Sequence, residues 1–144
     1  LGWLLAPEPV ARAAAAVHQF VVACAPTPSQ YLALEAFEEP RWLGALRPEL
    51  ARGRAAMLAA IESELGLPHA PAEGAFYVFV DTRAVAPDSL RLAEELLTEA
   101  DVVTAPGIAF GAPGEGHLRL SYGGSPAEIA RGVARIGRHL RQEV

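Results

Sequence analysis

The stretch TAPGIAFGAPGEGHLRLSYGGS, residues 104–125, decides how the rest of the chain is interpreted. It places six glycines around one short apolar run, and that run holds a single charge, Arg119, between Leu118 and Leu120. A short apolar run bounded by glycines is typical of a β-strand. A strand with one interior arginine is either an edge strand with a solvated face or a strand that directs the arginine toward an anion.

The second half of the chain predicts a small mixed or antiparallel sheet with helices packed on one side, an α+β arrangement within an α/β protein. Strands are expected over residues 75–80, 101–105 and 116–122. Helices are expected over residues 48–65, ended by a glycine at position 66, and from a cap at Asp88 or Ser89 to about Ala100. A last helix opens at Pro126, and its apolar residues at positions 129, 133, 136 and 140 fall on one face.

The first half predicts helices and a joint. Leu1–Ala6 is a short apolar run that suits a buried strand, and Glu8–Ala25 reads as an alanine-rich helix. Ser29 is the expected N-cap of a second helix that extends to Phe37. Residues 38–46 contain a proline and a glycine, so we expect a joint there and a domain boundary near its end.

The composition argues against several classes of partner. The net charge is -5 with no basic patch, which argues against nucleic acid as the main partner. The longest apolar stretch, residues 13–25, is too short to span a bilayer, so no membrane partner is expected. Cys24 is the only cysteine, which indicates a reducing compartment and a cytoplasmic location. All 12 cationic residues are arginine, and the sequence contains no lysine.

Several constellations suggest chemistry but have simpler explanations. The glycine-rich loop resembles a phosphate cradle, yet it leads into a strand and not into a helix N-terminus. Cys24 and His18 point to different faces of one helix, so Cys24 is expected to be a small buried residue. Ser121, His117 and Asp101 carry the side chains of a hydrolase triad without a nucleophile elbow. The four histidines have no ligand spacing, so no metal site is expected.

The acidic pairs and the last arginines are expected to be solvated helix faces: Glu62 with Glu64, Glu94 with Glu95, and the series Arg131, Arg135, Arg138 and Arg141. Arg119 is different because its guanidinium offers paired donors that match a carboxylate. From residue chemistry alone, a clamp for a small anionic substrate and an ion pair with a nearby acid such as Glu115 remain equally open.

Residues 106–125 closely resemble the C-terminal signature of class I/II aminotransferases, the pyridoxal-phosphate enzymes of fold type I. Three further stretches agree in order and spacing. Leu1-Gly2-Trp3 resembles the run that follows the family's catalytic lysine, and residues 27–30 resemble its Ser-x-x-Gln helix start. Residues 73–77 resemble its Gly-Gly-Phe-Tyr strand, with Ala75 where the family has its second glycine.

The resemblance implies roles. Arg119 would hold the α-carboxylate of an amino acid or 2-oxo acid, and Phe76 and Tyr77 would lie near the substrate's side-chain end. The cofactor would be pyridoxal 5'-phosphate, and the enzyme a homodimer. The Schiff-base lysine and the phosphate-binding arginine would precede Leu1, so no catalytic or cofactor-binding residue is expected here.

The chain is therefore identified as a fragment, inactive alone. Residues 1–46 would be the C-terminal remnant of the large cofactor-binding domain, and residues 47–144 the complete small domain. Two alternatives remain: another fold type I enzyme such as a C–S lyase, which needs the same carboxylate clamp, and a non-catalytic binding module that keeps the small-domain fold without cofactor.

Overall fold

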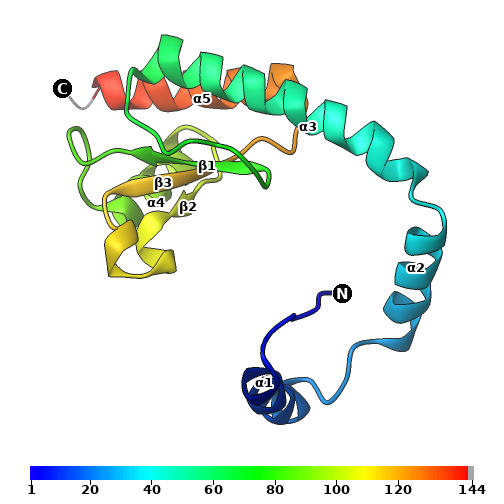
Figure 1. Cartoon of the computed structure of the whole chain (residues 1–144). Helices are drawn as coiled ribbons and strands as arrows, with labels where there is room; N and C mark the ends of the chain where they lie inside the picture. Colours follow the sequence, from blue (N-terminus) through cyan, green and yellow to red (C-terminus); the bar gives the residue numbers. More distant parts are fainter. Residues whose placement is uncertain (143–144) are drawn as a thin grey trace. The chain divides into compact units, whose positions relative to one another are not determined.

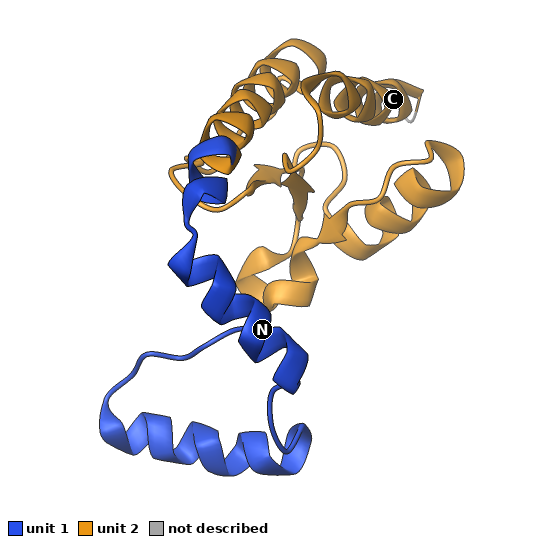
Figure 2. Cartoon of the chain, turned by 90° about the vertical axis from the view of Figure 1, so that its right-hand side faces the viewer, with its two compact units in different colours: residues 1–45 blue, residues 46–144 orange. Residues whose placement is uncertain are grey.

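The computed structural model describes residues 1–142, and the chain divides into two compact units, residues 1–45 and 46–144 (Figure 2). Residues 143 and 144, the end of the predicted small domain, lie outside the described residues.

Two helices make up most of the first unit: α1 (Glu8–Val21) and α2 (Thr27–Glu38) (Figure 1). Each carries a proline in its first turn, where the missing N–H costs no hydrogen bond. Because of this proline, α2 begins at Thr27, and the prediction that Ser29 caps it was wrong. The first helix ends at Val21, four residues before its predicted end.

The predicted strand at Leu1–Ala6 is absent, and this segment has no regular secondary structure. A strand needs a neighbour to receive its backbone hydrogen bonds, and within residues 1–142 none pairs with this segment. Leu5 is 97% exposed. Trp3 packs its ring against Phe37 of α2, with 5.5 Å between the centroids.

A long helix, α3 (Arg41–Ala60), continues into a π-helical turn, η1 (Ile61–Leu65). The predicted joint over residues 38–46 was too wide, since α3 begins at Arg41 and includes Pro48. The predicted stop is confirmed: Gly66 ends η1 in the left-handed conformation with φ of 62°, which glycine adopts without steric cost.

The sheet has three antiparallel strands: β1 (Tyr77–Asp81), β2 (Ala105–Pro106) and β3 (His117–Ser121). Their order is β1-β3-β2, so β3 is the central strand (Figure 1). The predicted strand over residues 101–105 was wrong except at its last residue, where β2 begins. The physical reason is that Asp101, which follows the end of the preceding helix, has a positive φ of 52°, which a strand residue does not adopt.

Two more helices complete the fold: α4 (Ser89–Glu99), capped by the Asp88 side chain, and α5 (Pro126–Gln142). Both lie where the sequence predicts them. β1 and β3 each bury alternate residues, so one face of the sheet packs into a single core with the helices and the other stays open. The core contains Met57, Ile61, Val78, Val80, Leu92, Leu96, Leu118, Leu120, Ile129, Val133 and Ile136.

Candidate functional site

The open face of the sheet collects the polar and aromatic side chains of β1 and β3. The backbone register pairs Tyr77 with Ser121, Phe79 with Arg119 and Asp81 with His117. Successive strand residues point to opposite faces, so these six residues share the face that the core leaves uncovered. They are half-buried or exposed, whereas the residues between them are buried.

Arg119 lies at the centre of this face and on the central strand, so the edge-strand interpretation does not apply. Its guanidinium carbon is 5.0 Å from the ring centroid of Tyr77 and 4.8 Å from that of Phe110. Within residues 1–142, no acidic side chain forms an ion pair with it. The site is therefore a half-buried cation held between aromatic rings, without a counter-ion in the described part of the chain.

Glu115 does not neutralise Arg119, so that alternative was wrong. The Glu115 carboxylate accepts the backbone N–H of Ser89 at 2.7 Å and that of Gly116 at 3.0 Å. These two hydrogen bonds to the ionised form lower the pKa of Glu115. Ser89 in turn accepts the N–H of Ile108 on its hydroxyl at 3.2 Å, which ties the start of α4 to the loop before β3.

The resemblance singles out two neighbouring aromatics, and the structure gives them different surroundings. Tyr77 opens β1 and contacts the Arg119 guanidinium. Phe76 precedes the strand and packs its ring edge-on against Tyr77 at 5.6 Å. Phe110, which contacts Arg119, was missed by sequence reasoning. The only signal for it was its place in the Phe-Gly pair of the glycine-rich signature.

The glycine-rich loop forms two 3-10 turns, η2 (Gly107–Phe110) and η3 (Ala112–Gly114). Gly107 and Gly114 pack backbone against backbone, and a Cβ on either would collide with the other's carbonyl oxygen. The loop's amides are used inside the protein. Hydrogen bonds to other protein groups are donated by the N–H groups of Ile108, Gly111, Gly114, Glu115 and Gly116. The loop therefore supports a ring beside Arg119 and does not present a phosphate cradle.

Tyr122 fixes the start of β1. Its ring is buried, and its hydroxyl donates to the carbonyls of Gly74 and Ala75 at 3.2 and 3.3 Å. Ala75 has a positive φ of 59°, at the position where the resembling family has a glycine. The chain thus enters the site through a strained residue held by a buried tyrosine.

The other candidate sites considered from the sequence are not supported by the structure. Ser121 donates to the Phe76 carbonyl at 3.4 Å, His117 lies 3.1 Å from the Glu115 carbonyl, and Asp101 lies two residues after the end of α4. Cys24 is exposed, so its predicted burial was wrong: it follows α1 in a unit whose helices bury no residue. Among the described residues, no group of three potential ligands could hold a metal ion.

The arginines of α5 are exposed, as predicted for a solvated face. Two of them contact neighbouring elements: Arg135 donates to the Asp101 carbonyl at 3.3 Å, and Arg141 donates to the Glu64 carbonyl at 3.0 Å. Such contacts at helix ends explain these residues without a ligand.

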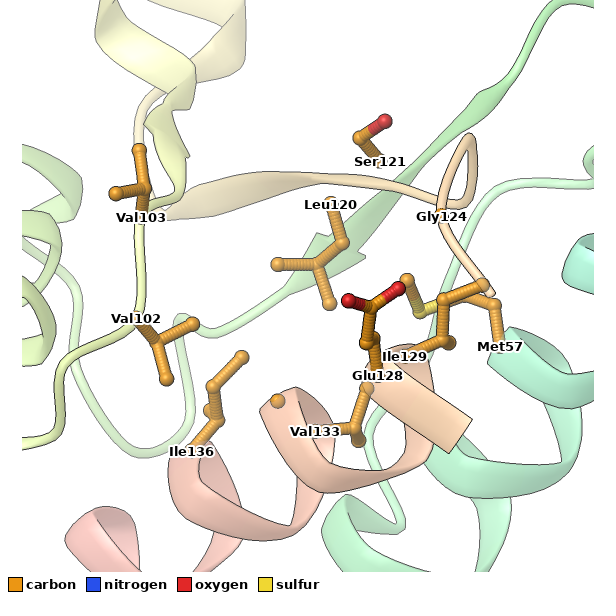
Figure 3. Close-up of a pocket in the computed structure, with 11 residues that line it drawn as sticks. Met57, Val102, Val103, Leu120, Ser121, Gly124, Glu128, Ile129, Val133 and Ile136 are labelled. Carbon is orange, nitrogen blue, oxygen red and sulfur yellow. The ribbon is translucent and has the colours of Figure 1, made fainter. Parts of the chain in front are cut away.

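A cavity of about 210 Å³ opens on the other side of the sheet (Figure 3). Leu120 points into it from β3, together with Val102 and side chains of α3 and α5, whereas Ser121 points away. Among the described residues, Glu128 is the only acid that lines it. The cavity belongs to the core side and is separate from the open face that carries Arg119.

Comparison with known proteins gives a consistent result. The profile of the family described as aminotransferase class I and II matches residues 1–136. The aspartate/prephenate aminotransferase of Thermus thermophilus is 36% identical over 143 residues, which are 97% of this chain and 36% of that protein. The aromatic-amino-acid aminotransferase 2 of Thermococcus litoralis is 32% identical over 99% of this chain and 37% of its own length.

Comparison with solved structures also finds aminotransferases. The crystal structure of an aminotransferase from Mycobacterium tuberculosis is similar with a TM-score of 0.79 and 33% identity, over 98% of this chain and 37% of that one. An aromatic aminotransferase from Pyrococcus horikoshii gives a TM-score of 0.76 and 32% identity. The chain thus spans a little over a third of the length of the relatives it matches. Within residues 1–142, no helix is both long and apolar enough to cross a membrane.

Proposed function

The chain belongs to the class I and II aminotransferase family, and we propose that it is the C-terminal part of an enzyme that moves an amino group between an amino acid and a 2-oxo acid. The observation that carries this proposal is Arg119, a half-buried guanidinium on the open face with no acidic partner among residues 1–142. The two substrate classes share one group, an α-carboxylate, whose two oxygens match the guanidinium's paired donors.

Arg119 binds the substrate's α-carboxylate in this proposal. A charge-assisted, two-point contact fixes orientation as well as position, which is what a reaction at the neighbouring carbon requires. The aromatic residue at position 76 would then border the remainder of the substrate, and Tyr77 contacts the Arg119 guanidinium itself. The relatives named above support amino-acid and 2-oxo-acid substrates, and which side chain is accepted is a property of the whole protein.

Pyridoxal phosphate is the cofactor that the family implies, and it supplies the electron sink for this chemistry. The residues of this chain do not fit the cofactor by themselves. The sequence has no lysine to bind it covalently, and the amides of the glycine-rich loop already donate inside the protein. We therefore assign cofactor binding to a part of the enzyme outside these 144 residues, and expect the chain alone to be inactive.

The domain assignment is part of the same proposal. Residues 1–46 would be the tail of the large cofactor-binding domain, and residues 47–144 the small domain. The apolar surface of α1 and α2, which bury no residue, supports a larger domain over the first segment. As the family resemblance implies, the full-length enzyme would be a homodimer. The single unpaired cysteine suits a cytoplasmic location.

The test is isotope transfer by the full-length protein that carries this chain. Purified protein with pyridoxal phosphate would be incubated with ¹⁵N-glutamate and a panel of 2-oxo acids, and the products identified by mass spectrometry. Transamination predicts the label on a new amino acid and an equal amount of 2-oxoglutarate. Absence of label transfer across the panel would contradict the proposal.

The same preparation separates the alternatives. A C–S lyase would release thiol, ammonia and a 2-oxo acid from cysteine conjugates. A binding module would lack the visible absorbance of bound pyridoxal phosphate. The relatives named above are aminotransferases, which favours label transfer over either alternative.

A further inference from the structure

Three aromatic rings gather around Arg119 on the open face. Tyr77 and Phe110 lie 5.0 and 4.8 Å from its guanidinium carbon. Phe79 is paired with Arg119 across the strands and packs edge-on against Phe110 at 5.3 Å. The rings come from two parts of the chain, β1 and η2, so the cluster exists only in the folded unit.

We propose that Tyr77 and Phe110 are positioning residues for the carboxylate-binding arginine, and that they act by holding its guanidinium through cation–π contacts. This inference rests on the proposed function and deepens it. For Tyr77 it differs from the role that the resemblance implies, since the ring serves the arginine and not the substrate's side chain. For Phe110 it assigns a role to a residue that had none.

The geometry of a guanidinium explains how rings can hold it without blocking it. The N–H groups of the guanidinium lie in its plane and point outward from its edges, whereas aromatic rings attract its positive charge over their faces. Contact with Tyr77 and Phe110 therefore leaves edge donors for a carboxylate. An acidic partner would use those donors instead, and Arg119 has none within residues 1–142.

Holding the side chain before substrate arrives has a further effect. A long arginine side chain loses rotamer freedom when it binds a ligand, and a side chain that is already held loses less. Phe110 is itself held, because Phe79 packs against its ring and the Gly107–Gly114 contact fixes its turn. The rings thus act on the substrate through Arg119.

The experiment compares ring removal with ring retention in the full-length enzyme. Tyr77→Leu and Phe110→Leu remove the rings but keep apolar volume, and Tyr77→Phe keeps the ring as the matched control. Each removal is expected to raise KM for both the amino acid and the 2-oxo acid by about three- to tenfold with kcat within about twofold, because binding is lost equally in ground and transition states. Tyr77→Phe keeps the ring, so its KM should rise less than the KM of Tyr77→Leu.

A second arm repeats the ring removals in an Arg119→Ala background, and the dissociation constant of 2-oxoglutarate is measured by calorimetry for all variants. If the rings act through Arg119, removing them there changes neither KM nor the dissociation constant. The inference would be overturned if ring removal raised KM equally in both backgrounds. It would also be overturned if ring removal left KM unchanged in the parent enzyme. An Arg119→Ala enzyme with unchanged KM and kcat would instead overturn the proposed function.

Discussion

At the scale of single residues, Arg119 differs from the other arginines in its surroundings. Arg83 pairs with Asp81, Arg91 with Glu95 and Arg141 with Glu64, each at the surface. These exposed pairs explain little of the stability, because water and salt screen their charges. Arg119 contacts rings instead, and the cost of half-burying its charge is offset only in part by them. In the proposed function, the substrate's carboxylate supplies the missing counter-charge.

The candidate role of Arg119 could be predicted from the sequence, whereas the contact of Phe110 with it could not. A lone charge between two leucines of a strand can be recognised from the local pattern. The contact between Phe110 and Arg119 depends on how η2 folds over the end of β3, and this in turn depends on the Gly107–Gly114 contact and on Glu115. Such tertiary placement leaves no local signal.

Ala75 gives a prediction at this scale. An L-residue at a φ of 59° is strained by about 1–2 kcal/mol, whereas glycine pays only its greater backbone entropy. Ala75→Gly should therefore raise the free energy of unfolding by about 0.5–1 kcal/mol, measured by urea titration. Ala130→Gly, on the exposed face of α5, is the control and should lower it by about 1 kcal/mol. A loss of stability in Ala75→Gly would argue against strain at this turn.

At the scale of elements, local patterns succeeded where one face packs into the core. The apolar stripe of α5 follows from its periodicity, and the structure confirms it together with the strands expected around β1 and β3. The strands expected at residues 1–6 and 101–105 were wrong because strand formation needs a partner. The first has none in the described chain, and residues 101–104 have no regular structure because the chain turns at Asp101 with a positive φ.

Glu115 joins two elements and gives a pH prediction. The N–H groups of Ser89 and Gly116 lower the folded pKa of Glu115, so its stabilising effect is fully present above the pKa that this carboxyl has in the unfolded chain. That effect is lost as pH falls through the lower folded value. Glu115→Gln should lower the free energy of unfolding at pH 7, and the difference from the parent chain should shrink toward pH 3.

Urea titrations at several pH values measure this difference in the free energy of unfolding. The control is Glu62→Gln, which makes the same substitution at an exposed residue of η1. A difference between Glu115→Gln and the parent chain that is equally large at pH 7 and pH 3 would show that the carboxylate's charge is not the cause.

At the scale of the whole molecule, the two units differ in how they bury apolar surface. The second unit has a core of its own, whereas α1 and α2 bury no residue and expose Phe20, Tyr31, Leu32 and Phe37. Contiguous exposed apolar surface marks a face that another structure covers. This contrast is consistent with the lengths of the two relatives compared above, of which the chain covers 37% and 36%.

The exposed surface predicts self-association of the 144-residue chain. Light scattering over a concentration series should give a mass above 15.2 kDa that increases with concentration. Phe20→Arg, at a side chain 91% exposed on α1, should reduce the association, whereas Gln19→Arg adds the same charge beside it and should matter less. A concentration-independent monomer would contradict the view that these helices are a covered face.

The most direct measurement is kcat/KM of the full-length enzyme after Arg119→Ala, with Arg138→Ala on the exposed face of α5 as the control. If Arg119 binds the substrate's α-carboxylate, as proposed, loss of its charge should cost about 2–5 kcal/mol, a fall in kcat/KM of roughly 30- to 5,000-fold. The Arg138→Ala enzyme should keep its kcat/KM. An Arg119→Ala enzyme as active as the parent would contradict the assignment of this open sheet face as the carboxylate-binding site.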